Sequence, residues 1–345
     1  MVISLNAVFG QNGVLDMGML AGWYERTGPA LDVIKTGEMA MPEPAPGEVL
    51  VRLHASGINP SDYKKRGNAK VAAEYPLVIP HSDGAGLVAG LGAGVGGFSV
   101  GEKIWTFNAQ WGRPFGTAAQ FIALPADRIS KLSTSTSFAE GACLGIPAMT
   151  GCRVIFMDGP VTGQTIYVPA ATGRVGAYAL QFAKWGGATV IASAGNAERA
   201  AGARALGADH VIDRSSEDVV TRILELTGGR GVDRIAEVEF GGNMPINAQI
   251  LAQDGVIASY ASAHAPKAEI TVSPRRARNM SMHFVFVYML NPRAIVDTCA
   301  LVNAADTQGA LKHRIAGTFP LEQLAEAHAQ AERESGTGHM VVTIE

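Results

Sequence analysis

The chain has 345 residues, of which 47% are hydrophobic and 17% charged, and its formal net charge is −3. This composition supplies large apolar cores, which argues against a disordered chain, and the small negative charge argues against general binding to nucleic acid or anionic lipid. Three cysteines without a CxxC spacing argue against a disulfide framework, and no apolar run approaches the ~20 residues that span a bilayer.

The N-terminal residues, MVISLNAVFG, lack the basic region of a secretory signal. We therefore expect a cytoplasmic protein with no membrane partner. Residues 1–18 differ in character from the rest of the chain, and we interpret them as an extension or as the product of an upstream start codon.

Residues 19–145 predict a module of short strands and turns. AGWYERTGPALDVI (21–34) is interpreted as a strand, a polar turn and a second strand. GEVLVRLHASGIN (47–59) alternates apolar and polar residues, as a half-buried strand does. Frequent Pro and Gly between residues 42 and 80 divide this segment into short elements, which predicts a β-rich module whose loops carry the functional residues.

The pattern changes near residue 147, where short apolar strands begin to alternate with helices. We expect strands at 165–170, 189–193, 210–213, 233–238, 255–261 and 282–289, and helices at 174–185, 197–206 and 219–227. Strands that alternate with helices of this length indicate βαβ units and a parallel sheet. After residue 289, one more helix and the segments 312–317, 320–332 and 339–345 are expected to complete the first module. The predicted architecture is an α/β fold in which a nucleotide-binding domain (147–288) is inserted into a split β-rich domain (1–146 and 289–345).

The most informative motif is the turn Ala171-Thr172-Gly173-Arg174-Val175-Gly176, which follows one predicted strand and opens a helix. A dinucleotide-binding fold needs small residues here, so that the backbone approaches the pyrophosphate at the helix N-terminus. Ala171 replaces the first glycine of GxGxxG, which weakens the bare pattern, but the order strand, turn, helix and strand supports it. The alternative is an ordinary strand-to-helix turn with close packing.

The strand after this turn ends near Ser193 and Gly195, where NAD-dependent enzymes usually carry an acid that binds the ribose 2′-hydroxyl. No carboxylate occurs there, which leaves room for a 2′-phosphate. Arg199 and Arg214 follow, and guanidinium groups suit phosphate in charge and geometry. We therefore expect NADPH rather than NADH. Either arginine could instead be a solvated surface charge, and Arg174 could contact the pyrophosphate or mark an exposed helix start.

With these motifs in hand, the chain resembles the zinc-free quinone oxidoreductases of the medium-chain dehydrogenase/reductase superfamily, which include zeta-crystallin. The resemblance rests on the segment AATGRVGAYALQFAKWGGATVIASAGN and on ERTGPALDV, GINPSDYKKRG, HSDGAG, FGTAAQFIALPA, ACLGIPAMTG and EAHAQAERESGTGHMVV, so it spans nearly everything from Met19 onward. It implies a Rossmann domain inserted into a split GroES-like catalytic domain. It also implies a homodimer formed through the last strand of the nucleotide domain, here residues 282–289.

The resemblance also implies cofactor contacts along the nucleotide domain. These positions are Thr172, Gly173, Arg174, Val175, Gly176, Gly195, Gly241, Ser259, Tyr260, Ala261, Ser262, Val285, Phe286 and Val287. Thr150 is either a further contact on the nicotinamide side or a helix core residue. The chain departs from the family at Arg174, where a second glycine is usual, at Arg214, where an aromatic residue or histidine is common, and at His339, where many members have lysine.

Zinc-dependent relatives place a Cys and a His at the positions that Asn59 and Pro60 occupy here, and a His-Glu pair where this chain has Ser82-Asp83. His81 lies one position early, and the four-cysteine structural lobe is missing. A zinc site needs about three nitrogen or sulfur ligands, so we expect no metal. Without a Lewis acid an alcohol is hard to activate, which disfavours alcohol oxidation.

The remaining chemistry is hydride transfer to an acceptor that is already electron-poor: a quinone, or the C=C bond of an α,β-unsaturated ketone or aldehyde. Asn59, Tyr63 and Lys64 are the candidate catalytic residues, because they could donate a hydrogen bond or a proton to the acceptor oxygen. Alternatively Asn59 and Pro60 only shape a turn, Tyr63 packs in place and solvent supplies the proton.

Trp105, Phe107, Trp111 and Phe115 could form an aromatic wall for a flat acceptor, or a local hydrophobic cluster. Quinone reduction is the leading hypothesis, followed by C=C reduction. A third hypothesis, of a different class, is an NADPH-binding sensor or RNA-binding protein with little turnover. The acidic net charge and the lack of a basic, aromatic-rich stripe weigh against RNA.

Overall fold

The computed structural model describes residues 8–9, 15–16, 18–270, 278–333 and 338–345. Two compact units divide the chain. Unit 1 comprises residues 1–146, 315–335 and 339–345, and unit 2 comprises residues 147–314 and 336–338. In the predicted N-terminal extension, only the short strands β1 (Val8–Phe9) and β2 (Leu15–Asp16) and residue 18 are described, and β1 and β2 pair antiparallel. The rest of that prediction lies outside the described residues.

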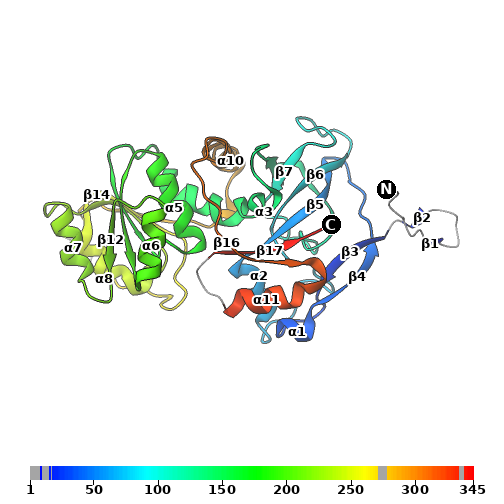
Figure 1. The fold of residues 1–345 in the computed structure, drawn as a ribbon, viewed down its shortest axis with the longest axis horizontal. Coiled ribbons are helices and arrows are strands. Elements are labelled where there is room, and N and C mark those ends of the chain that lie inside the picture. Colours follow the sequence, from blue (N-terminus) through cyan, green and yellow to red (C-terminus); the bar gives the residue numbers. More distant parts are fainter. Residues whose placement is uncertain (1–7, 10–14, 17, 271–277, 334–337) are drawn as a thin grey trace. The chain divides into compact units, whose positions relative to one another are not determined.

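Unit 1 is built on a seven-stranded sheet in the order β16-β17-β5-β6-β7-β9, with β8 also paired to β5 (Figure 1). Its strands are β5 (Glu48–Ile58), β6 (Asp83–Leu91), β7 (Lys103–Thr106), β8 (Phe121–Pro125), β9 (Ile129–Lys131), β16 (Ile315–Pro320) and β17 (His339–Thr343). The predicted alternation in β5 is present, because Val49, Val51 and Leu53 lie in the core and Arg52 is exposed. Strands from both ends of the chain therefore share one sheet, as a split domain requires.

Unit 1 also contains the antiparallel hairpin β3 (Gly18–Trp23) and β4 (Lys35–Ala40) and the helices α1 (Ala30–Val33), α2 (Pro60–Gly67), α3 (Phe138–Gly141) and α11 (Leu324–Arg333). The prediction of a second strand within 21–34 is wrong, because Ala30–Val33 form a single helical turn. Pro29 is the N-cap of this turn, and the N–H of Ile34 donates to the carbonyl of Ala30. The strand begins only after this turn, at Lys35.

Unit 2 contains a six-stranded, fully parallel sheet in the order β12-β11-β10-β13-β14-β15. The strands are β10 (Thr165–Pro169), β11 (Thr189–Ala194), β12 (His210–Asp213), β13 (Val232–Glu237), β14 (Leu251–Ser259) and β15 (Ser281–Phe284). In chain order this is 3-2-1-4-5-6, the doubly wound order of dinucleotide-binding domains, with its switch point between β10 and β13. The predicted parallel sheet is confirmed.

The helices of unit 2 are α4 (Met149–Phe156), α5 (Arg174–Trp185), α6 (Ala197–Ala205), α7 (Val219–Leu226), α8 (Phe240–Ile250) and α10 (Pro292–Thr307). Helices α5 and α6 pack on β10, β11 and β12, whereas α8 packs on β13 and β14. Asn196, Asp218 and Asn291 start α6, α7 and α10, because each side chain accepts the N–H three residues later. Among the described residues no helix is long and apolar enough to cross a membrane.

Two predictions for unit 2 need correction. The strand expected over 282–289 ends at Phe284, and Val287–Met289 form a 3-10 turn, because the neighbouring strand β14 ends at Ser259 and offers no further partner after Val285. The return to the first module, expected at residue 289, lies instead at residue 315. Helix α10 packs on α4 and therefore belongs to unit 2.

Candidate functional site

One edge of the unit 2 sheet collects nearly all the predicted cofactor residues. Because every ladder is parallel, the carboxyl ends of the strands coincide: Pro169 lies opposite Ser193, Glu237 opposite Ser259, and Ser259 opposite Phe284. Ligands of doubly wound sheets bind outside this edge, at the switch point. Ser193 and Ser259 lie within the last two residues of a strand, and all the other predicted positions except Thr150 lie within seven residues after a strand end, so the chain leaves this edge of the sheet close to each of them.

The glycine turn joins β10 to α5. Gly173 is the N-cap of α5 and has no side chain to cap it, so the first N–H groups of the helix point out of the turn without a side-chain cap. A Cβ added to Gly176 would lie 2.3 Å from the carbonyl oxygen of Ala170, so only glycine allows α5 to approach the strand end this closely. These features fit a dinucleotide pyrophosphate at the helix N-terminus.

Two arginines follow neighbouring strands, Arg199 after β11 and Arg214 after β12. An added Cβ at the exposed residue Gly195 would lie 3.5 Å from Nη2 of Arg214. Arg199 lies in the first turn of α6, where its backbone N–H donates to Asn196. Neither side chain has a hydrogen bond or ion pair among the described residues, while Ser193 is buried and its Oγ lies 2.8 Å from Oη of Tyr167. Two guanidinium groups without a hydrogen bond or ion pair among the described residues, and the lack of an acidic residue from Ser193 to Ala197, fit a phosphate on the ribose.

Arg174 does not mark an exposed helix start, because only 8% of its surface is exposed. Its Nε donates a 2.9 Å hydrogen bond to the carbonyl oxygen of Gly338, which belongs to the same unit. The predicted pyrophosphate contact of Arg174 stays a prediction. The arginine side chain is held by a hydrogen bond to Gly338, a residue that is distant in the sequence.

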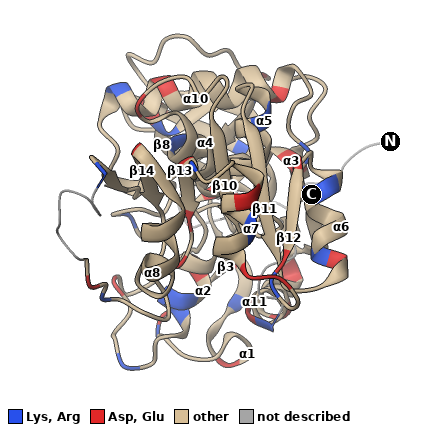
Figure 2. Ribbon diagram, turned by 90° about the vertical axis from the view of Figure 1, so that its left-hand side faces the viewer, with Lys and Arg blue, Asp and Glu red and all other residues tan. Residues whose placement is uncertain are grey.

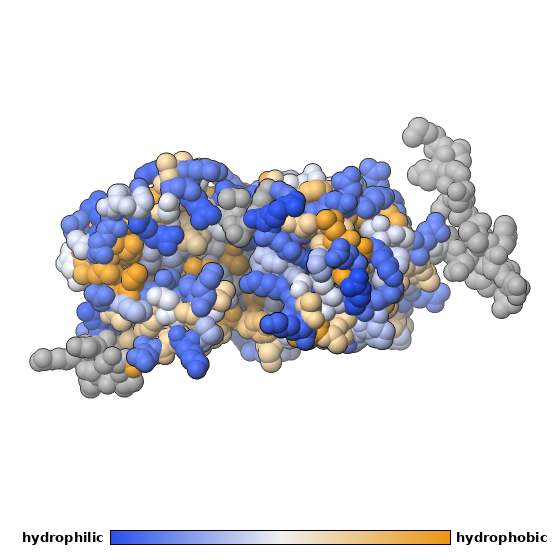
Figure 3. Space-filling view, turned by 90° about the horizontal axis from the view of Figure 1, so that it is seen from below, coloured by the Kyte–Doolittle hydropathy of each residue, from blue (hydrophilic) through white to orange (hydrophobic). Residues whose placement is uncertain are grey.

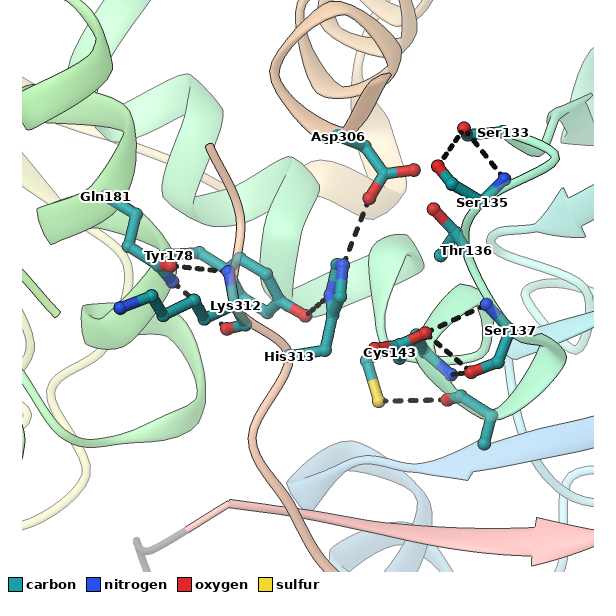
Figure 4. A network of polar contacts seen from close by, with 12 residues as sticks. Ser133, Ser135, Thr136, Ser137, Cys143, Tyr178, Gln181, Asp306, Lys312 and His313 are labelled. Carbon is teal, nitrogen blue, oxygen red and sulfur yellow. Dashed lines mark hydrogen bonds and ion pairs between the residues drawn. The ribbon is translucent and has the colours of Figure 1, made fainter. Parts of the chain in front are cut away.

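The segment 308–314 contacts this turn, a contact that no sequence motif indicates. Nη1 of Arg314 donates to the carbonyl oxygen of Thr172 at 2.8 Å, inside the phosphate turn. Figure 4 shows how neighbouring residues of the segment are held: Oη of Tyr178 lies 2.8 Å from Nδ1 of His313, whose Nε2 lies 3.0 Å from Oδ1 of Asp306. The turn and the first half of α5 are thus tied to the segment through which the chain leaves unit 2.

The opposite end of the edge is formed by residues after β13, β14 and β15. The N–H of Gly241 donates to Oγ of Ser262 at 2.9 Å, and the N–H of Val285 donates to the carbonyl oxygen of Ser259 at 2.7 Å. Burial, followed by the charge of Glu237, raises the pKa of the Tyr260 hydroxyl, so this group stays protonated. Of the other predicted contacts, Ala261 is half-buried, Phe286 is half exposed, and Thr150 and Val287 are buried.

In unit 1, the predicted catalytic residue Asn59 begins α2. Its Nδ2 donates a 2.7 Å hydrogen bond to Oδ2 of Asp83, and its backbone N–H donates to Oδ2 of Asp62 at 2.7 Å. Asn59 is 2% exposed. The carboxylate of Asp83 also accepts the N–H of Ile146, yet complete burial raises the pKa of Asp83 well above its usual range. This arrangement favours the alternative in which Asn59 shapes the turn before α2.

The other two candidates lie on α2 itself. Tyr63 is half-buried and packs against the core of unit 1, whereas Lys64 is exposed and has no hydrogen bond or ion pair within the described part of the chain. The end of α2 is anchored, because the fully buried Arg66 donates to the carbonyl oxygen of Gly28 and pairs with Glu332 of α11. The backbone of α2 that carries Lys64 is therefore held in place by the contacts of Arg66.

The four predicted aromatic residues do not form one wall. Trp105 and Phe107 are buried in the core, with ring centroids 5.5 Å apart. Trp111 and Phe115 are 39% and 44% exposed. Phe115 lines a cavity of about 250 Å³ within unit 1, together with Met19, Met39, Ile79, Arg113 and Phe121. The alternative of a local hydrophobic cluster therefore applies to Trp105 and Phe107 only.

His81 is buried in a polar network. Its Nδ1 lies 2.7 Å from Oγ of Ser56, and its Nε2 lies 2.8 Å from Nε2 of His328. Both ring nitrogens are therefore engaged by protein groups. Within the described ranges, no three His, Cys, Asp or Glu side chains gather in a way that could hold a metal ion.

Family models match both halves of the chain. A model of the alcohol dehydrogenase GroES-like domain matches residues 45–134, and a model of the zinc-binding dehydrogenase matches residues 175–302. Quinone oxidoreductase of Rattus norvegicus is 28% identical over 328 residues, which cover 93% of this chain and 96% of that protein. A 2-haloacrylate reductase of a Burkholderia species is 29% identical over 322 residues, covering 90% and 95%.

Solved structures give the same result. A mycobacterial quinone oxidoreductase superposes with a TM-score of 0.83 at 25% identity and covers 94% of this chain and 99% of its own. A 2-haloacrylate reductase superposes with a TM-score of 0.82 at 26% identity, with the same coverage. The predicted fold, a GroES-like domain with an inserted Rossmann domain, is confirmed by these matches.

Proposed function

The chain belongs to the medium-chain dehydrogenase/reductase superfamily of oxidoreductases, whose members bind nicotinamide cofactors, and on this basis we propose that it is an NADPH-dependent, zinc-independent quinone reductase. The observation that carries the proposal is the carboxyl edge of unit 2. There the glycine turn before α5 follows the end of β10, the guanidinium of Arg214 lies beside Gly195 after β11, and Arg199 lies in the first turn of α6. A site of this composition suits a dinucleotide with a 2′-phosphate.

The preference for NADPH follows from charge. A carboxylate at the end of β11 would bind a ribose hydroxyl and repel a phosphate, whereas this strand ends in Ser193, Ala194 and Gly195. Gly195 leaves space beside the guanidinium of Arg214, and Arg199 follows four positions later in the chain, in the first turn of α6. Charge-assisted hydrogen bonds from arginine are among the strongest that proteins make to phosphate.

The nicotinamide ring, when bound, supplies the hydride. The chain has to position the acceptor and to stabilise the charge that develops on its oxygen. We propose Lys64 and Tyr63 of α2 as donors for this purpose, with solvent as the alternative proton source, and Asn59 as the residue that fixes the start of α2. Zinc independence is supported by Asn59 and Pro60 at the ligand positions of zinc-dependent relatives and by the engagement of both nitrogens of His81.

Reduction of an activated C=C bond is a second candidate. It is favoured by the similarity to 2-haloacrylate reductase, because the sequence identity and the share of the chain covered are close to those of the quinone oxidoreductases. Both reactions place hydride on an electron-poor carbon and charge on an oxygen. The sensor or RNA-binding alternative gains no support, since Figure 2 shows basic and acidic positions interspersed along the ribbon rather than one basic stripe.

We also propose a homodimer formed along β15 and a cytoplasmic location. β15 is the edge strand of its sheet, and an open apolar edge is a site for pairing with a second strand. Phe284, Phe286 and Met289 are 71%, 50% and 75% exposed. On the face drawn in Figure 3, orange, apolar areas lie among blue, polar ones. The cytoplasmic proposal is supported by three buried cysteines that form no disulfide.

The test is to titrate the full chain with NADPH and NADH by nicotinamide fluorescence, and then to add 9,10-phenanthrenequinone and 1-octen-3-one separately. We expect tighter binding of NADPH and faster oxidation of NADPH with the quinone. Faster turnover of the enone would replace quinone reduction by C=C reduction. NADPH binding without turnover of either acceptor would favour the sensor, and equal binding of both cofactors would contradict the role of the two arginines.

A further inference from the structure

Glu239 lies between β13 and α8, yet its side chain binds the loop that follows β14. Its carboxylate accepts the backbone N–H groups of Ala263 at 3.0 Å, His264 at 3.1 Å and Ala265 at 2.9 Å. Nδ1 of His264 lies a further 3.0 Å from Oε2 of Glu239. Three consecutive N–H groups around one anion form a backbone nest, a feature that proteins use to bind anions. Here the chain's own carboxylate fills it.

The carboxylate is ionised over the whole physiological range. Burial raises its pKa, but the N–H groups of Ala265, His264 and Ala263 and the ring of His264 outweigh this and lower the pKa of Glu239 to about 2. A charged acceptor strengthens each of these hydrogen bonds. The nest therefore holds its shape without an external ligand.

Close backbone packing surrounds the same loop. A Cβ added to Gly241 would lie 1.9 Å from the carbonyl oxygen of Ala265, so the start of α8 and the loop touch at a position that only glycine permits. Oγ of Ser262 accepts the N–H of Gly241, and the N–H of Phe240 donates to the carbonyl oxygen of Ala261 at 3.2 Å. Glu239 supplies the charged bonds in this contact.

We propose that Glu239 is a positioning residue that fixes the loop Tyr260–Ala265 in the shape needed to receive the nicotinamide half of the cofactor. The inference rests on the proposed function. Its premise is that Tyr260, Ala261 and Ser262 follow a strand at the carboxyl edge, on the far side of the switch point from the arginines of β11. Residues 263–265, which Glu239 holds, fix the other end of this short segment.

The test compares Glu239→Gln with the unchanged chain, using two ligands. NADPH carries both halves of the cofactor, whereas 2′,5′-ADP carries only the adenosine half and its 2′-phosphate. We expect the substitution to weaken NADPH binding about 10-fold or more, as loss of charge-assisted hydrogen bonds predicts, and to leave the dissociation constant of 2′,5′-ADP unchanged. Glu239→Asp should recover part of the loss. Glu225→Gln, an exposed acid of α7, is the matched control.

A second measurement needs no cofactor. Amide hydrogen exchange at residues 263–265 should be faster in Glu239→Gln than in the unchanged chain, because the carboxylate protects these three N–H groups. Unchanged exchange, or equal weakening of NADPH and 2′,5′-ADP, would overturn the positioning role. If the unchanged chain binds neither ligand, the proposed function itself fails, and this result is distinct because the exchange measurement is unaffected.

Discussion

Acidification is expected to destabilise unit 1 through the buried pair His81 and His328. Both side chains are fully buried, and their Nε2 atoms lie 2.8 Å apart. Burial lowers the pKa of His81 to about 3. Burial, and after it electrostatic repulsion by His81, if protonated, and by Arg66, lowers the pKa of His328 well below its usual range. Both imidazoles are therefore neutral in the folded chain at neutral pH.

The sign and size of the effect follow from linkage. In the unfolded chain each histidine takes up a proton near pH 6.5, so the stabilisation is fully present above that pH and is lost as the pH falls below it. An imidazole that stays neutral in the folded chain at pH 5 lowers the free energy of unfolding by about 2 kcal/mol between pH 7 and pH 5. Two such groups give about 4 kcal/mol, a large part of the stability of a typical domain.

The assay is urea unfolding at pH 7, 6 and 5, followed by tryptophan fluorescence. Three of the four tryptophans lie in unit 1, so a Trp185→Phe background confines the signal to that unit. His328→Gln should halve the loss between pH 7 and pH 5. His210→Gln, which changes an exposed histidine, should leave it unchanged. The reasoning is refuted if His328→Gln and the background lose the same free energy over this interval.

Three further predictions concern unit 2. Arg214→Gln should weaken NADPH about 10- to 100-fold in a fluorescence titration and leave NADH unchanged, since one charged bond to phosphate is lost; equal losses would contradict a 2′-phosphate site. Gly176→Ala should lower the midpoint of urea unfolding by the equivalent of about 1–3 kcal/mol, because its Cβ would collide with Ala170; an unchanged midpoint would show that the turn can yield. Phe284→Glu should dissociate the proposed dimer in sedimentation, whereas Leu31→Glu, exposed on unit 1, should not; a dimer that survives would place the interface elsewhere.

The sequence predicted the fold best where local signals agree. The helix expected over 174–185 has those limits in the structure, because the glycine turn before it and Gly186 after it mark both ends. The prediction was wrong where an apolar segment extends beyond the end of the strand with which it pairs. Residues 282–289 are β-prone throughout, but the pairing ends near Val285 because β14 ends at Ser259. Strand length is set by the neighbour, which the local pattern does not contain.

The candidate site shows the same division. Residues that follow strand ends, such as Gly173 and Gly195, could be found from spacing, because the topology of a parallel sheet brings strand ends together. Asn59 carried a donor at a plausible position, but its partner Asp83 lies 24 residues away on another strand, and that contact engages its carboxamide. The residue type predicts that Asn59 can donate a hydrogen bond, and the tertiary structure determines that Asp83 accepts it.

The contacts that hold the cofactor edge at its two ends share a property that hides them from sequence patterns. Arg314 reaches the carbonyl oxygen of Thr172 across 142 positions, and Glu239 reaches Ala265 across 26. Both side chains act largely on backbone N–H and C=O groups, which nearly every residue carries, so a search for side-chain motifs does not register these contacts. A motif search finds the glycines that let the backbone approach a ligand. The side chains that keep that backbone in place follow from the fold, and they are the positions at which the two halves of the cofactor site can be perturbed separately.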